Sequence, residues 1–89
     1  MVTRLRVRYF ASLREALGPG EEVELDGGDG AAADIAALRR LLVARGGRHA
    51  QALAAGRAVR CALDRVMADG DAPLRDGAEV AFFPPVTGG

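Results

Sequence analysis

The alternation of charged and apolar residues near the start of the chain most limits the folds open to it. Between residues 4 and 10, one side of the chain carries Leu5, Val7 and Tyr9. The other side carries Arg4, Arg6 and Arg8, followed by the apolar Phe10. Successive side chains of a β-strand point to opposite faces of the sheet, so this period of two predicts a strand with one face buried and the other in water.

Further segments with the same period predict four more strands, at 22–25, 59–63, 66–68 and 79–83. The strand at 22–25 is expected to pair with the first one as a hairpin. Asp64 and Arg65 are expected to form a tight turn between the third and fourth strands, although Arg is unusual in the second position of such a turn. In the last strand, Val80 and Phe82 share one face, while Ala81 and Phe83 share the other.

The segment 35–44 is the main predicted helix, with Asp34 as its N-cap and Gly46-Gly47 at its end. Its apolar residues form one stripe: Ile35, Leu38, Leu41 and Leu42. Its arginines would form a solvated face: Arg39, Arg40 and Arg45. Ser12 is expected to cap a short helix over 13–17, and 48–55 has weaker helical character.

One helix stripe and one sheet face predict a two-layer α+β domain over residues 1–83. The simplest packing is a mixed sheet of four to five strands against one main helix. If the first and last strands are neighbours at the centre of that sheet, the arrangement is the β-grasp fold of ubiquitin.

Three large apolar residues fall on the face of the sheet opposite the helix: Phe10, Phe83 and Met67. If the first and last strands are neighbours, Phe10 and Phe83 lie close together. An exposed apolar patch typically marks a binding surface, so we predict that these residues dock a partner protein.

Residues 84–89 are predicted to form a flexible, extended tail. Pro84 and Pro85 cannot donate to a sheet ladder, so they end the last strand and favour an extended path. Six residues reach about 20 Å at ~3.3 Å each. Gly88 and Gly89 lack Cβ atoms, so a narrow tunnel in a partner could accept the tip, and the terminal carboxyl carbon would be the reactive atom.

Composition excludes several functions. Twelve acidic residues balance twelve basic ones, which argues against nucleic-acid or membrane partners. The chain has no Lys, a single Cys and a single His. Cys61 is expected to pack inertly in the core. His49 is expected to be a surface or cap residue with no metal site around it. No signal peptide or apolar span is present, so we expect a soluble cytoplasmic protein.

The Gly-rich loop over 26–30 lacks the Lys and the Ser or Thr of a phosphate-binding loop and is interpreted as a turn. With so few general bases, the chain is better suited to be acted upon than to catalyse.

Both ends of the chain resemble one family. The ending at 82–89 (Phe-Phe-Pro-Pro-Val-Thr-Gly-Gly), the preceding segment 74–81 and the opening segment 9–18 (Tyr-Phe-Ala-Ser-Leu-Arg-Glu-Ala-Leu-Gly) resemble the ubiquitin-like sulfur-carrier subunits of molybdopterin synthase. A terminal Gly-Gly is common to ubiquitin-like proteins, whereas the full ending is much more specific.

The resemblance implies a carrier without a bound cofactor. A ubiquitin-activating-like adenylyltransferase would use ATP to form an acyl-adenylate on Gly89, and a sulfur donor would convert it to a thiocarboxylate. Gly88 would keep the approach slim. The tail would enter the large catalytic subunit and deliver sulfur to a cyclic pterin monophosphate precursor, forming the molybdopterin dithiolene.

The resemblance also implies partner contacts along Pro84, Pro85, Val86 and Thr87, and a heterotetramer of two small and two large subunits. Three alternatives remain open. These are a sulfur carrier for thiamin thiazole synthesis or another thiolation pathway, a ubiquitin-like tag conjugated to other proteins, and a plain interaction module.

Overall fold

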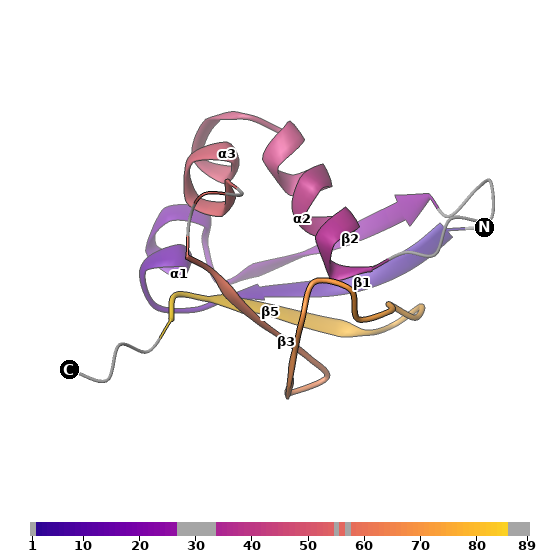
Figure 1. Cartoon of the computed structure of the whole chain (residues 1–89). Helices are drawn as coiled ribbons and strands as arrows, with labels where there is room; N and C mark the ends of the chain where they lie inside the picture. The colour runs from indigo at the N-terminus through magenta and orange to yellow at the C-terminus, as the bar shows by residue number, and fades with distance from the viewer. Residues whose placement is uncertain (1, 27–33, 55, 57, 86–89) are drawn as a thin grey trace.

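The computed structural model describes residues 2–26, 34–54, 56 and 58–85. Its elements are β1 (Val2–Tyr9), α1 (Ala11–Leu17), β2 (Gly20–Asp26), α2 (Ile35–Ala44), α3 (Gly47–Leu53), β3 (Arg60–Leu63), β4 (Val66–Ala68) and β5 (Glu79–Phe83). Within these ranges, five strands form one mixed sheet in the order β2-β1-β5-β3-β4 (Figure 1). The predicted α+β class and the main helix are confirmed.

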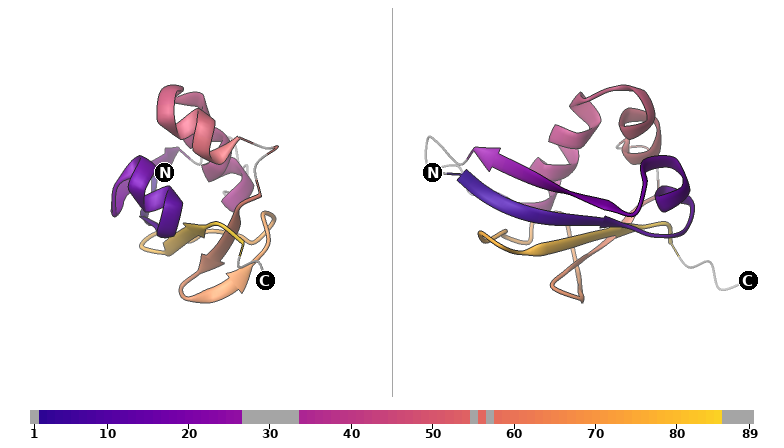
Figure 2. Two further views of the ribbon diagram at one scale, coloured as in Figure 1. Left: turned by 90° about the vertical axis from the view of Figure 1, so that its left-hand side faces the viewer. Right: turned by 180° about the vertical axis from the view of Figure 1, so that it is seen from behind.

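The first and last strands lie side by side at the centre of the sheet. β1 and β5 are parallel, with Tyr9 opposite Phe82, while β2 and β3 flank them in antiparallel pairs. Figure 2 shows α2 and α3 on one side of the sheet and α1 at the end where β1 and β5 finish. The predicted β-grasp fold is confirmed, and none of the described helices lies on the other face of the sheet.

The core fills the space between the sheet and the helices. Its largest side chains, each less than 2 % exposed, come from both layers: Leu5, Val7, Tyr9, Val80 and Phe82 from the sheet, and Ile35, Leu38, Leu42 and Leu53 from the helices. Asp34 caps α2 as expected, since its Oδ1 accepts a hydrogen bond from the Ala37 amide at 2.7 Å. Cys61 is half-buried against the core, its Sγ lies 3.2 Å from the Ala68 carbonyl oxygen, and burial raises the pKa of its thiol.

The prediction that Ser12 caps the first helix is wrong. α1 begins two residues earlier than predicted, its N-cap is Phe10 in an extended conformation, and no side chain caps it. The Phe10 amide donates to the Phe82 carbonyl, and the Phe10 carbonyl accepts from the amides of Leu13 and Arg14. The helix therefore starts where pairing of β1 with β5 ends, and this tertiary constraint overrides the capping preference of Ser12.

Arg39 does not belong to a solvated face, contrary to expectation. Its guanidinium donates to the carbonyl oxygens of Leu53 and Ala54 at 2.6 and 2.7 Å. Helix C-termini leave carbonyls without intrahelical partners, and Arg39 satisfies two of them. It thereby ties α2 to the end of α3, whereas Arg40 on the same helix is exposed.

His49 is also more enclosed than a surface residue. Its Nε2 lies 3.1 Å from a carboxylate oxygen of Glu21, and its ring meets Tyr9 edge-on. Glu21 also accepts from the Tyr9 hydroxyl at 2.9 Å and pairs with Arg45. Burial alone would raise the pKa of Glu21, but the hydrogen bonds from Arg45, His49 and Tyr9 outweigh it and lower that pKa. This cluster fastens β2 to the helical layer.

The turn between β3 and β4 forms as predicted. Asp64 and Arg65 both have positive φ, 48° and 70°, as a tight two-residue hairpin turn requires. The Asp64 side chain also accepts from the Glu79 amide at 2.9 Å, which ties the hairpin to β5. Of the loop predicted over 26–30, residues 27–30 lie outside the described residues.

Candidate functional site

The three apolar residues predicted to face away from the helices do lie together there. Tyr9 and Phe82 are paired across the parallel strands β1 and β5. Phe10 follows Tyr9 and Phe83 follows Phe82, so Phe10 and Phe83 are neighbours on the opposite face. Met67 reaches the same place from β4, because it pairs with Ala62, which in turn pairs with Ala81.

The resulting surface is the open-face patch, defined by Phe10, Ala62, Met67, Ala81 and Phe83. Phe10 and Met67 are 41 % and 55 % exposed, and Phe83 is half-buried. The alanines between the larger side chains leave an open depression of about 580 Å³. Such a surface can receive apolar side chains of a partner, which is the role predicted for it.

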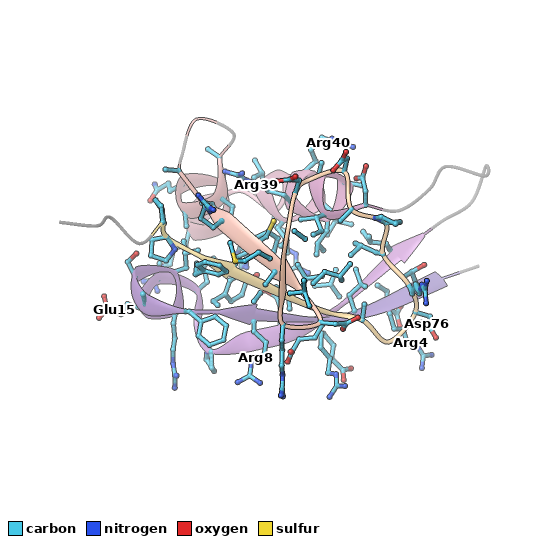
Figure 3. All side chains as sticks on the ribbon, turned by 60° about the horizontal axis from the view of Figure 1, so that its bottom comes forward. Arg4, Arg8, Glu15, Arg39, Arg40 and Asp76 are labelled. Carbon is cyan, nitrogen blue, oxygen red and sulfur yellow. The ribbon has the colours of Figure 1, made fainter. Side chains whose placement is uncertain are left out.

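Charged residues border the open-face patch. Arg8 and Arg65 both approach the carboxylate of Glu79, at 3.5 and 3.7 Å. The Arg8 guanidinium carbon also lies 5.8 Å from the centre of the Phe10 ring, within the range of a cation–π contact. Figure 3 shows Arg8 pointing from the sheet on the side opposite Arg39 and Arg40.

The prediction from sequence did not include this charged border. The alternation of β5 places Glu79 on the same face as Ala81 and Phe83, and the alternation of β1 places Arg8 on the face of Phe10. The signal was therefore present in the same pattern that identified Phe10 and Phe83.

The root of the tail is held against the body. Pro84 and Pro85 are both half-buried, and Pro84 lines a depression together with Leu13 of α1 and Val59 before β3. Phe83 and Pro84 therefore join the open-face patch to the start of the tail. The remaining predicted site residues lie outside the described residues: Val86, Thr87, Gly88 and Gly89.

The described part of the chain contains neither a metal-binding cluster nor a membrane-spanning helix. No group of three or more His, Cys, Asp or Glu side chains there could hold a metal ion. None of the described helices has the length and apolar character needed to cross a membrane. The candidate functional site is therefore the open-face patch at the base of the tail, where the predicted docking residues lie.

A family model identifies the chain. The model of the ThiS family matches residues 7–89, which include the whole open-face patch and the terminal diglycine. The chain belongs to the ThiS family.

Relatives of this ThiS-family chain carry a more specific description. The molybdopterin synthase sulfur carrier subunit of Escherichia coli is 41 % identical over 86 residues, covering 96 % of this chain and 99 % of the relative. The protein of the same description from Haemophilus influenzae is 36 % identical over 85 residues, covering 96 % and 99 %. The family resemblance predicted from the two ends of the chain is confirmed.

Solved structures agree with the fold. The solution structure of the HVO 2177 protein of Haloferax volcanii has a TM-score of 0.78 at 28 % identity, covering 99 % of this chain and 88 % of that one. A complex of subunits 1 and 2 of the molybdopterin-converting factor from Helicobacter pylori contains a chain with a TM-score of 0.61 at 26 % identity, covering 98 % and 100 %. A chain with a similar fold is thus found in a complex of two different subunits.

Proposed function

We propose that this chain is the sulfur-carrier subunit of a molybdopterin synthase, with the carboxyl group of Gly89 as the point of attachment. The observation that carries the proposal is the 41 % identity over nearly the full length to a subunit of that description. The open-face patch at the base of the tail supports it, because a carrier must dock before it can present its end.

The chemistry follows from the properties of a terminal carboxylate. Such a group has a pKa near ~3.5, so at neutral pH it is ionised and a poor electrophile. An adenylyltransferase partner joins it to AMP from ATP and releases pyrophosphate. A sulfur donor then displaces AMP, so that a carbon–oxygen bond breaks and a carbon–sulfur bond forms. The resulting thiocarboxylate carries a more nucleophilic sulfur atom.

The large subunit of the synthase supplies the catalytic groups. The tail enters it, and the sulfur of Gly89 bonds to the cyclic pterin precursor. Water then cleaves the bond between the Gly89 acyl carbon and that sulfur, which leaves the sulfur on the precursor and returns Gly89 to a carboxylate. Two small and two large subunits form the working assembly in the cytoplasm. The complex of subunits 1 and 2 from Helicobacter pylori supports the pairing with a large subunit.

Intact-mass measurement tests this proposal. The chain is incubated with ATP, a sulfur donor and the adenylyltransferase of the same organism. A mass increase of about 16 Da, the replacement of oxygen by sulfur, is expected. Adding the large subunit and the pterin precursor should return the mass to its starting value.

A variant that ends at Thr87 serves as the matched control and should gain no mass. An unchanged mass in the full-length chain would contradict the proposal. Covalent adducts to other proteins through Gly89 would indicate a protein tag instead.

A further inference from the structure

The charge of the chain is unevenly distributed around the open-face patch. The chain as a whole has a formal net charge of zero. At the patch, however, Arg8 and Arg65 face a single carboxylate, that of Glu79. Their side chains are 53 % and 86 % exposed, whereas that of Glu79 is 21 % exposed. The border therefore presents two outward cations around one recessed anion.

A third arginine adds to this excess. Arg60 of β3 lies opposite Phe83 in the antiparallel register with β5, and residues opposite each other have their side chains on the same face of a sheet. Arg60 is exposed. The positive charge thus extends from the turn at Arg65 to the position beside Phe83, where the tail begins.

Docking of a partner would remove water from the guanidinium groups at the border of the patch, which carries a free-energy cost. A partner that covers Phe10, Met67 and Phe83 removes water from Arg8 and Arg65. Removing water from a charge is unfavourable unless another charge or a hydrogen-bonding group replaces that water. At 3.5 and 3.7 Å from one shared carboxylate, neither guanidinium has the close bidentate pairing that offsets such a cost.

From this imbalance we propose that the open-face patch selects a protein surface in which carboxylates surround an apolar contact area. Arg8 and Arg65 would pair with Asp or Glu side chains of that partner, and Arg60 would pair beside the root of the tail. The inference rests on the proposed function in naming the large subunit as one such partner. Complementary charge at a border chiefly accelerates association and suppresses wrong partners.

Association kinetics with the purified large subunit test the inference. The Arg8→Gln/Arg65→Gln variant should associate about tenfold more slowly than the unmodified chain at about 0.02 M salt, and its rate should depend less on salt. Glu79→Gln removes the recessed anion, so it should associate faster at low salt. Because the two variants are expected to change the association rate in opposite directions, the comparison separates an effect of charge from general damage to the surface.

Arg40→Gln is the matched control, because Arg40 is an exposed arginine of α2 on the helical side of the sheet (Figure 3). Its association rate should match that of the unmodified chain, and thermal unfolding should show that all the variants are folded.

Association by the unmodified chain that does not vary with salt, or equal slowing in Arg40→Gln, would overturn this inference alone. Failure of the unmodified chain to bind the large subunit would count against the proposed function as well. Binding to nucleic acid rather than to the large subunit would show that the arginines bind phosphate groups and not carboxylates, which would overturn the inference.

Discussion

The two faces of the sheet at β1 and β5 differ in burial although adjacent residues form them. Tyr9 and Phe82 are each 1 % exposed, and their rings stack with centroids 6.4 Å apart beneath the helices. Phe10, the residue that follows β1, is 41 % exposed, and Phe83, the last residue of β5, is half-buried. One step along a strand thus separates a side chain that folds the domain from one that is free to meet a partner.

Replacement of the adjacent phenylalanines of β5 tests this difference most strongly. Phe82→Ala should lower the free energy of unfolding by about 3–5 kcal/mol, because it leaves a cavity in the core. Phe83→Ala should lower it by about 1 kcal/mol or less, because that half-buried side chain lies on the open face of the sheet and is not part of the core cluster. Denaturant unfolding followed by circular dichroism measures both values. Equal losses would place Phe83 in the core.

The polar cluster around Glu21 gives the next largest effect, on the covered face. Glu21→Gln should cost about 1–2 kcal/mol at neutral pH, since it weakens hydrogen bonds made to a carboxylate. The pKa of Glu21 is lower in the folded chain than in the unfolded chain. Its contribution is therefore complete above the unfolded value of about 4.3 and is lost as pH falls through the folded value.

Denaturant unfolding of the unmodified chain and of Glu21→Gln, measured from neutral to acidic pH, checks the sign of that effect. The stability difference between the unmodified chain and Glu21→Gln should shrink as pH falls below about 4.3. A difference that stays constant, or that grows in acid, would show that the carboxylate does not hold β2 to the helices as described.

The two arginines of α2 give a smaller contrast within the helical layer. Arg39→Ala should cost about 1–2 kcal/mol, because the carbonyls of Leu53 and Ala54 lose a charged donor. Arg40→Ala should change stability by no more than about 0.5 kcal/mol, because the residue is exposed. Thermal unfolding compares them, and equal values would remove the role assigned to Arg39.

Gly88→Val should have the smallest effect on stability, with an unchanged melting temperature. We nevertheless expect this variant to lose sulfur transfer, since an added β-branched side chain widens the tip that, under the proposed function, enters the large subunit. The assay is conversion of the pterin precursor by the synthase assembled with the variant. Full activity would show that the tip need not be narrow.

The sequence predicts the strands and the open-face patch well because both depend on alternation, which a sheet converts directly into two faces. Phe10, Phe83 and Met67 could be placed on one surface once β1 and β5 were taken as neighbours. The boundaries of α2 were equally predictable, since Asp34 is a local signal whose hydrogen bond stays within the first turn of the helix.

The errors concern residues whose partners are distant in sequence. Ser12 has the chemistry of a cap, but Phe10 is fixed by its hydrogen bond to Phe82, which starts the helix earlier. Arg39 looks solvated from helix periodicity alone, because its carbonyl partners belong to α3. His49 of α3 looks like a surface residue for the same reason, because its partner Glu21 belongs to β2 in the sheet. The border of Arg8, Arg65 and Glu79 was missed because three separate elements form it.

The affinity of Phe83→Ala for the large subunit tests the division between folding face and docking face most directly. We predict a dissociation constant at least about thirtyfold higher than that of the unmodified chain, as for a central interface aromatic residue, with little change in melting temperature. Val66→Ala is the control, because Val66 is 67 % exposed but lies outside the open-face patch, and its affinity should not change. Unchanged affinity in Phe83→Ala, or equal weakening in Val66→Ala, would contradict the account.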